Sequence, residues 1–296
     1  MERIEPSRNL RLLLLVPVWA VAAAAALSAS SLLIRIPATL VLGVLLVTVS
    51  VVMHEGCHRL LFRTRRANRL AATLLGFPIL LSATAYRALH LRHHSFEHTE
   101  RDPDDIDGLH RRGLPPVVIY YLVLLVGTYL YFPHVAREGW RAAHSAAERR
   151  AIAAEYAALI LLLGLAWWLA PEPMLRLWFW PLVVAAQLTS LRSLAEHGLT
   201  SGDNPFVATR SVRTGRLLGF LICHLNLHLE HHLFPGVPWY NLPAVHRLVA
   251  PWARAAGASV YDGYGAFFRD FLRVTWSGVV PRMRLVPAHL REELCD

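Results

Sequence analysis

Long apolar stretches alternate with short polar stretches along most of the 296-residue chain. Four apolar stretches are long enough to form membrane helices, because about 20 apolar residues span the hydrocarbon core of a bilayer. These predicted spans are residues 12–27, 37–53, 152–170 and 174–191. Short turns join them into two hairpins, one around Arg35 and one at Pro171-Glu172-Pro173. The pattern therefore predicts an all-α membrane protein.

Two other apolar stretches fit a different role. Residues 70–85 are interrupted by Gly76 and Pro78 and flanked by arginines, and residues 117–132 precede a segment, 134–150, that carries four arginines. Under the positive-inside rule the segment 134–150 stays cytoplasmic, so residues 117–132 would begin and end on the cytoplasmic side and are predicted to be a re-entrant or interfacial helix. Residues 70–85 are interpreted in the same way, because they are interrupted and have arginines on both sides. The expected topology has four crossings, with both termini inside.

The end of the chain is less apolar. Residues 215–223 form a short apolar piece, and residues 235–296 are amphipathic and predicted to be a cytoplasmic region outside the bilayer. No internal repeat or low-complexity tract marks a second domain. We therefore expect one domain over residues 1–296.

Three histidine clusters lie at the ends of apolar segments: His54-Glu55-Gly56-Cys57-His58, His90-Leu91-Arg92-His93-His94 and His228-Leu229-Glu230-His231-His232. On a helix, positions i, i+3 and i+4 share one face, so each cluster can direct several imidazoles to one point. A single exposed histidine pair is usually polar surface, but a repeated His-x-x-His-His pattern beside a third pair is hard to obtain by chance. Since imidazole binds iron, copper and zinc well, the clusters predict a metal site on the cytoplasmic side.

Charge and cysteine content narrow the class of protein. The net charge of +9 comes entirely from arginine, which suits a surface on anionic lipid headgroups better than a nucleic-acid site, because the arginines are spread between apolar segments. Cys57, Cys223 and Cys295 are odd in number and far apart, so no disulfide framework is expected. Cys57 and Cys223 are best interpreted as small buried residues.

The order and the flanking residues of the clusters resemble the integral-membrane fatty acid desaturase superfamily, over roughly residues 54–243. His94 is followed by Asp102-Pro103-Asp104, the third cluster lies within Asn226–Pro235, and a separate Glu196-His197-Gly198 stands between clusters. The resemblance implies a non-haem di-iron centre that activates O2. The ligands that it implies are His54, His58, His90, His93, His94, His197, His228, His231 and His232.

Metal-bound histidines need acceptors for their second ring nitrogen. We favour Glu196, Asn226 and Glu230 for site roles, because each lies within two residues of an implied ligand. The other acidic candidates are Glu55, Glu97, Asp102 and Asp104. For Asp102 and Asp104 the alternative is that they turn the chain around Pro103. Of the remaining histidines, His98 and His224 fit either the site or the surface, and a larger group is predicted to be ordinary surface or interface: His110, His134, His144, His246 and His289.

The resemblance implies an O2-dependent oxidase that introduces a double bond into a fatty acyl or related lipid chain. A hydroxylase or ketolase of a carotenoid or alkyl lipid is the alternative, because the ligand pattern serves both outcomes. His54-Glu55-Gly56-Cys57-His58 also matches the zinc-protease pattern His-Glu-x-x-His, but that function leaves two clusters unexplained. A metal transporter is disfavoured, since the predicted spans have few ionisable residues other than Glu155.

Electrons are expected from an external ferredoxin or cytochrome b5-type donor. The sequence has no His-Pro-Gly-Gly haem motif, dinucleotide-binding glycine fingerprint or iron–sulfur cysteine set. An acidic donor or anionic lipid fits the arginines that surround the first two clusters: Arg63, Arg65, Arg66, Arg69, Arg111 and Arg112. We expect an integral protein of a bacterial inner membrane.

Overall fold

The computed structural model describes residues 3–105, 116–200 and 204–277 of the chain. Chain contacts separate two compact units. Residues 2–92 and 126–190 form what we call the membrane-helix unit, and residues 93–125 and 191–296 form the C-terminal unit. The single domain expected over residues 1–296 stays a prediction. Several residues considered above lie outside the described part of the chain: His110, Arg111, Arg112, His289 and Cys295.

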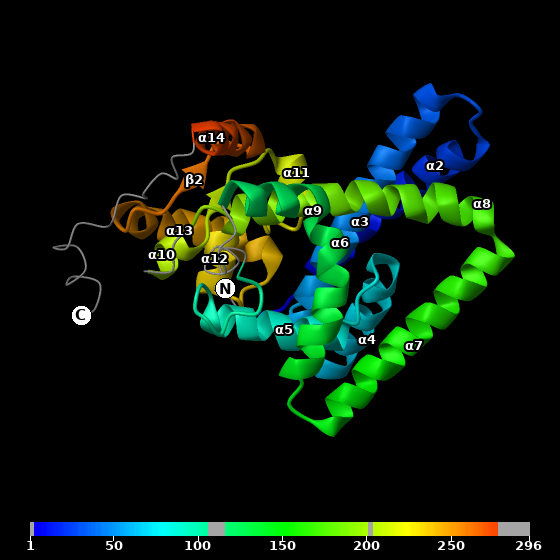
Figure 1. Ribbon diagram of the computed structural model, residues 1–296, viewed down its shortest axis with the longest axis horizontal. Coiled ribbons are helices and arrows are strands. Elements are labelled where there is room, and N and C mark those ends of the chain that lie inside the picture. Colours follow the sequence, from blue (N-terminus) through cyan, green and yellow to red (C-terminus); the bar gives the residue numbers. More distant parts are fainter. Residues whose placement is uncertain (1–2, 106–115, 201–203, 278–296) are drawn as a thin grey trace. The chain divides into compact units, whose positions relative to one another are not determined.

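Most of the membrane-helix unit is α-helical (Figure 1). Its first half contains α1 (Pro6–Asn9), η1 (Leu10–Leu14), α2 (Leu15–Ser28), α3 (Leu32–Cys57), α4 (Arg65–Gly76) and η2 (Phe77–Ile79). Its second half contains α7 (Ala146–Leu169), α8 (Pro171–Met174) and the π-helical η4 (Leu175–Phe179). Three helices contribute residues to both units: α5 (Ala83–Phe96), α6 (Pro116–Ala142) and α9 (Trp180–His197).

Five helices in the described residues are long and apolar enough to cross a membrane: Pro6–Ser28, Leu32–Cys57, Val117–Ala142, Ala146–Leu169 and Pro171–His197. Four of them cover the predicted spans, except that the third span extends one residue, Ala170, beyond the end of its helix. The fifth, Val117–Ala142, includes the stretch predicted to be interfacial, yet it is continuous over 26 residues. The count of four crossings therefore stays a prediction.

The broken segment before the second histidine cluster behaves as its glycine and proline predict. Arg65–Ile79 and Ala83–Phe96 are bent by 100° at a short break, as in a broken span or a re-entrant loop. Leu80 has a positive φ of 61° at this break. Gly76 leaves room for it, because a Cβ there would lie 2.4 Å from the Leu81 carbonyl oxygen.

The first hairpin turn lies earlier than the sequence predicts. Arg35 is inside α3, which begins at Leu32, so the turn expected around Arg35 is wrong. The reason is local capping: Ser31 has extended backbone, and its hydroxyl accepts a hydrogen bond from the Leu33 amide at 3.3 Å.

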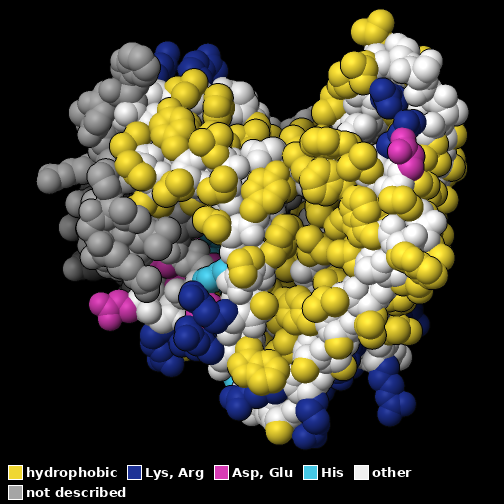
Figure 2. Space-filling view, turned by 45° about the vertical axis from the view of Figure 1, so that its right-hand side comes forward, with side chains coloured by type: hydrophobic (Ala, Val, Ile, Leu, Met, Phe, Trp, Pro, Cys, Tyr) yellow, Lys and Arg dark blue, Asp and Glu magenta, His cyan; other side chains and the backbone are white. Residues whose placement is uncertain are grey.

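Small residues and exposed apolar side chains suit these helices to a bilayer. Ala22, Ala26 and Ala38 are buried where α2 packs on α3, which lets the two backbones approach closely. In contrast, Leu33 is 86% exposed and Leu161 is 72% exposed. Hydrophobic side chains cover most of the face that Figure 2 shows. The chain is thus an integral membrane protein by composition and structure.

The C-terminal unit is built from short elements. They are α10 (Pro205–Ala208), β1 (Ser211–Val212), α11 (Arg216–Leu221), α12 (His228–Leu233), η5 (Trp239–Asn241), α13 (Leu242–Ala255), β2 (Val260–Tyr261) and α14 (Tyr264–Ser277). The two strands pair in parallel, with Ser211 opposite Val260. Tyr120, Phe267 and Phe271 form part of the buried core. Within residues 204–277 no helix qualifies as a membrane span, in line with the amphipathic pattern.

Candidate metal centre

Three histidines converge in the membrane-helix unit. His54 lies in the last turn of α3, His58 is the residue that ends this helix, and His90 lies on α5. The Nε2 atoms of His58 and His90 are 2.9 Å apart, and the His54 ring centroid is 4.6 Å from each of the other two. One ring nitrogen from each residue lies within 4.8 Å of the others. We call these three residues the α3–α5 cluster.

The chain reverses sharply after His58, which keeps this cluster at the end of α3. Arg59 has a positive φ of 67°, and the side chain of Asn68 then holds the reversed segment. The Asn68 Oδ1 accepts from the Leu61 amide at 2.9 Å, and its Nδ2 donates to the Phe62 carbonyl at 2.6 Å. Gly56 allows α4 to pack here, because a Cβ at Gly56 would already be 3.0 Å from the Ala72 Cβ.

The two non-histidine candidates of the first motif face different surroundings. Cys57 is buried, with its sulfur 3.5 Å from the Met53 sulfur and 3.6 Å from the Ala83 carbonyl oxygen. It therefore belongs to the hydrophobic core, as the sequence predicts. Glu55 is also buried, and its Oε1 lies 3.7 Å from the Nδ1 of His54.

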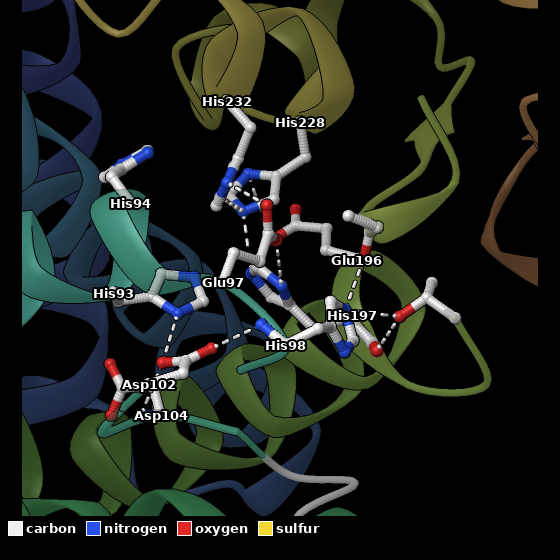
Figure 3. Close-up of polar contacts among 12 residues, drawn as sticks. His93, His94, Glu97, His98, Asp102, Asp104, Glu196, His197, His228 and His232 are labelled. Atoms are coloured by element: carbon white, nitrogen blue, oxygen red, sulfur yellow. Dashed lines mark hydrogen bonds and ion pairs between the residues drawn. The ribbon is translucent and has the colours of Figure 1, made fainter. Parts of the chain in front are cut away.

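A second group of histidines converges in the C-terminal unit (Figure 3). The Nε2 of His228, on α12, lies 2.8 Å from the Nε2 of His197 at the end of α9. The same atom lies 3.1 Å from the Nε2 of His232, one turn further along α12. The His93 ring centroid is 5.0 Å from His197 and 5.2 Å from His232. With Glu97, these four histidines form what we call the α9–α12 cluster.

Carboxylates contact the opposite ring nitrogens of this cluster. Glu97 lies 3.0 Å from the Nδ1 of His232 and 3.5 Å from the Nδ1 of His197. Glu196 lies 3.6 Å from the Nδ1 of His228. A carboxylate beside Nδ1 favours the tautomer in which the ring proton is on Nδ1. The lone pair of Nε2 is then left for a metal ion.

Glu97 is held as a carboxylate. Burial raises its pKa, but hydrogen bonds with His197 and His232 lower it by more, so the net pKa lies well below the usual range. The neighbouring ring remains neutral: burial lowers the pKa of His232, and this effect outweighs the nearby Glu97. Metal ions bind the neutral form of imidazole, so both shifts favour ligation.

Asp102 performs both of the roles that the sequence left open. One oxygen lies 2.9 Å from the Nδ1 of His93, and the Asp104 amide donates to the same oxygen at 2.9 Å. The other oxygen accepts from the His98 amide at 3.0 Å. Burial raises the pKa of Asp102, but the bond from His93 and these amides lower it below its usual value. A single carboxylate thus turns the chain and orients His93.

His94 and His231 are the remaining implied ligands in the C-terminal unit. Their Nε2 atoms are 3.2 Å apart, and the His94 ring centroid lies 4.2 Å from that of His232. All six ligands that the sequence places in this unit are therefore near one another. The three in the membrane-helix unit likewise converge.

These arrangements fit metal ligation. Imidazole nitrogens bind zinc at 2.0–2.1 Å, and two ligands at right angles around such an ion are about 3 Å apart. The spacings of 2.8 to 3.2 Å between facing Nε2 atoms match that value. The donor set is mainly imidazole, which suits iron, copper, nickel or zinc.

Two of the three favoured site residues face away from the histidine rings. Glu230 is buried, accepts from the Ser211 hydroxyl at 2.5 Å and lies 2.6 Å from the Nδ1 of His246. His246 is therefore a partner of Glu230 rather than an ordinary surface histidine. Asn226 donates to the Val212 carbonyl oxygen at 2.7 Å. Both residues secure α12 and the segment before it to β1, whereas the Glu196 carboxylate lies beside the His228 ring.

The structure also reveals a positioning role that the sequence did not predict. Arg210 is fully buried, and its guanidinium donates to the carbonyl oxygens of Ala195 at 3.3 Å and Leu199 at 2.8 Å. Its backbone amide donates to the Glu196 carbonyl at 3.1 Å. These carbonyls flank His197 at the C-terminus of α9, where a cation is favourable. No local sequence signal marks such a contact.

The two ambiguous histidines lie outside the convergent rings. The His98 ring contacts the Ala208 carbonyl oxygen at 2.7 Å and the Thr200 hydroxyl at 3.0 Å. His224 has a positive φ of 50° and stacks on Trp239, with ring centroids 5.9 Å apart. Both therefore support the backbone around the site.

The helices and the histidine clusters define a membrane protein with candidate metal-binding groups. Comparison with known proteins makes the class specific: the model of the family "Fatty acid desaturase" matches residues 30–264. The chain therefore belongs to the fatty acid desaturase family, whose members are oxidoreductases, and it has that family's histidine-box metal-binding pattern.

Two characterised relatives match shorter segments. A zeaxanthin 4-ketolase from Chlamydomonas reinhardtii is 38% identical over 58 residues, which is 19% of this chain and 13% of the ketolase. A Delta(5) fatty acid desaturase from Caenorhabditis elegans is 45% identical over 51 residues, which is 17% of this chain and 11% of the desaturase. The matched segments thus span about an eighth of each relative's length.

Proposed function

We propose that this protein is an O2-dependent oxidase that introduces a double bond into a fatty acyl or related lipid chain. The convergence of imidazole Nε2 atoms in each unit is the observation that supports the proposal most strongly. The membership of this chain in the fatty acid desaturase family is the second support for the proposal. Two hydrogens removed from the substrate and two electrons with two protons from a donor would reduce O2 to two waters.

In this proposal, two iron ions are held by the nine histidines that the family resemblance implies as ligands: His54, His58, His90, His93, His94, His197, His228, His231 and His232. The pair of iron ions, when bound, would supply the oxidising power needed to break an unactivated C–H bond.

The chain's own acidic residues hold the ligands in place. Glu97 and Asp102 accept hydrogen bonds from the Nδ1–H groups of His232 and His93, which fixes both the tautomer and the direction of each ring. Glu196 lies 3.6 Å from the Nδ1 of His228 and favours the same tautomer there. Asn226 and Glu230 support the polypeptide around α12. The apolar helices would keep bulk water from the reacting carbon, and an alignment of substrate within fractions of an ångström would select the outcome.

Ketone or alcohol formation is the second candidate, and the segment shared with the zeaxanthin 4-ketolase favours it. Loss of a second hydrogen gives a double bond, whereas return of oxygen to carbon gives an alcohol. The same ligands serve both reactions. Mass-resolved lipid profiles distinguish them: a desaturated product is lighter by two hydrogens, and a hydroxylated product is heavier by one oxygen.

The zinc-protease alternative uses His54, Glu55 and His58. Metal analysis of the purified protein separates the two functions, because the oxidase predicts about two iron ions per chain and the protease one zinc ion. Loss of His231 would leave a protease active but would disable the oxidase. A profile without any new product would point to a different substrate or electron donor.

We further propose that electrons come from a separate ferredoxin or cytochrome b5-type protein, and that the site faces the cytoplasm of a bacterial inner membrane. Arg63, Arg65, Arg66 and Arg69 are exposed and lie soon after His58 in the chain. An acidic donor would be attracted to this segment. A reduction rate that does not change with salt concentration would contradict docking by charge.

A further inference from the structure

Glu155 is a buried carboxylate in a helix that is apolar enough to cross a membrane. It lies ten residues into α7, and 8% of it is exposed. An ionisable group in a membrane helix is costly and usually has a specific partner or role. None of the histidines that the structure describes is among its hydrogen-bond partners, so its role must be sought in the groups that it contacts.

The carboxylate receives four hydrogen bonds within the membrane-helix unit. Its Oε2 accepts from the Ser82 hydroxyl at 2.6 Å and from the Thr84 amide at 3.0 Å. Its Oε1 accepts from the Thr84 hydroxyl at 2.6 Å and from the Thr73 hydroxyl at 3.1 Å. Three of the four donors belong to the residues at which α5 starts.

These contacts form a helix cap that is shared between two parts of the chain. The first amides of a helix have no partner inside it. Ser82, directly before α5, accepts from the Ala85 amide at 3.1 Å, and Glu155 accepts from the Thr84 amide. A negative charge at this end also interacts favourably with the helix dipole. The N-terminus of α5 is thus capped by two residues: Ser82, which directly precedes it in the chain, and Glu155, which belongs to α7.

The cap matters because α5 starts directly after the 100° break in the chain. After such a break, tertiary contacts must set the direction of the new helix. Two other segments pack against the same place. The Cys57 sulfur lies 3.6 Å from the Ala83 carbonyl oxygen. The backbone at Gly139 approaches α5 so closely that a Cβ there would lie 2.4 Å from the Ala85 carbonyl oxygen. The start of α5 is therefore tightly fixed.

A fixed start of α5 determines where His90 lies. Tyr86 is one turn after the cap, and its ring stacks on the His90 ring with centroids 5.0 Å apart and planes inclined by 17°. Tyr86 also contacts His54 edge-on at 6.4 Å. A change in the direction of α5 would move His90 relative to His54 and His58, which come from another helix.

We propose that Glu155 is a positioning residue for the α3–α5 cluster, acting through the N-terminus of α5 to hold His90 in ligating geometry. The inference rests on the proposed iron binding. Glu155 itself touches neither the ligands nor, in this proposal, the metal.

The test uses the full-length protein in lipid nanodiscs, with Fe(II) as the probe. Glu155→Gln keeps the size of the side chain but replaces an acceptor oxygen by an amide and removes the charge. We expect its Fe(II) affinity to fall by about tenfold, the lower end of the range for residues that orient metal ligands. Ser82→Ala leaves the carboxylate in place and should shift the affinity in the same direction by a smaller factor.

Thr128→Val is the matched control. Thr128 is in the same unit, and its hydroxyl bonds to the Ala186 carbonyl at 2.9 Å and to Ser190 at 2.8 Å, away from α5. It should lower thermal stability and leave Fe(II) affinity and the X-ray absorption spectrum of bound iron unchanged. Glu155→Gln and Ser82→Ala should alter that spectrum.

Three outcomes decide the matter. Unchanged Fe(II) affinity and spectrum in both Glu155→Gln and Ser82→Ala would overturn the positioning role. An equal loss of affinity in Thr128→Val would overturn it as well, since the effect would then follow general stability. Failure of the unmodified protein to bind Fe(II) would instead refute the proposed function on which the inference rests.

Discussion

The α3–α5 cluster and the α9–α12 cluster use charge in different ways. In the α9–α12 cluster, carboxylates reach the Nδ1 atoms of the ligands directly, as Glu97 does for His232 at 3.0 Å. In the α3–α5 cluster, the strongly hydrogen-bonded acid is Glu155, which contacts the start of a helix. The first arrangement orients single rings, and the second orients a whole helix.

The difference follows from the elements that carry the ligands. α12 has six residues, so it has little stability of its own and its rings need direct partners. α3 has 26 residues and α5 has 14, and each keeps its ligands on a regular helical framework. In our proposal, fixing the start of α5 is enough to fix His90 two turns away. A histidine can therefore be positioned either by a contact with its own ring or by a contact with the end of the helix that carries it.

Removal of a ligand from each cluster should have the largest effect. His58→Ala and His228→Ala should each reduce iron content and lower product formation by more than about 100-fold, since even partners behind metal ligands contribute 10- to 100-fold. Metal analysis and lipid profiling of the purified variants measure both quantities. His98→Ala is the control for the C-terminal unit, because its ring contacts Ala208 and Thr200 instead. Full activity of either variant would show that the cluster from which the histidine was removed is not needed for the reaction.

Glu97→Ala should come next. It removes the carboxylate from the Nδ1 atoms of both His197 and His232, so we expect a loss of about 10- to 100-fold in iron affinity. Titration with Fe(II) measures the effect. Glu100→Ala, an exposed acid three residues away, should leave the affinity unchanged. Equal affinities for the two variants would show that direct carboxylate contacts do not matter here.

Arg210→Met should destabilise the C-terminal unit. It removes charged hydrogen bonds to the carbonyls of Ala195 and Leu199, worth on the order of 2 kcal/mol in free energy of unfolding. Denaturant unfolding followed by fluorescence measures the loss, and iron affinity should fall by less than in Glu97→Ala. Arg213→Met removes an exposed ion pair with Asp262 and should change stability little. A larger loss in Arg213→Met would contradict the assignment.

Asn226→Ala should have the smallest effect. The side chain bonds to the Val212 carbonyl oxygen at 2.7 Å, so we expect a loss of about 1 kcal/mol in stability and an unchanged rate per bound iron. Unfolding curves and turnover normalised to iron test this. A strong decrease in turnover without loss of stability would instead give Asn226 a role in the chemistry.

Local patterns predicted much of the fold. Apolar stretches located the helices that correspond to the four predicted spans, and Gly76 and Pro78 located the break before α5. The turn at Arg35 was wrong because Ser31 caps α3 earlier. For residues 117–132 the positive-inside rule predicts a re-entrant or interfacial helix, but these residues lie within the continuous helix Val117–Ala142. Arginines indicate on which side of the membrane a segment stays, and they do not interrupt a helix.

The sequence by itself determined the membrane class, the family resemblance and the set of candidate histidines, because apolar length and the i, i+3, i+4 spacing are local properties. How these histidines group was decided by the tertiary structure, which places His90 beside His54 and His58 but His93 beside His197. Only the tertiary structure decided which acids serve the ligands. Glu230, next to a ligand in sequence, turns to Ser211 and His246, whereas Glu155 reaches Ser82 across 73 residues. Helical periodicity fixes the face on which a side chain lies, but its partner depends on how distant segments pack. That packing is the sum of many contacts that no short motif encodes.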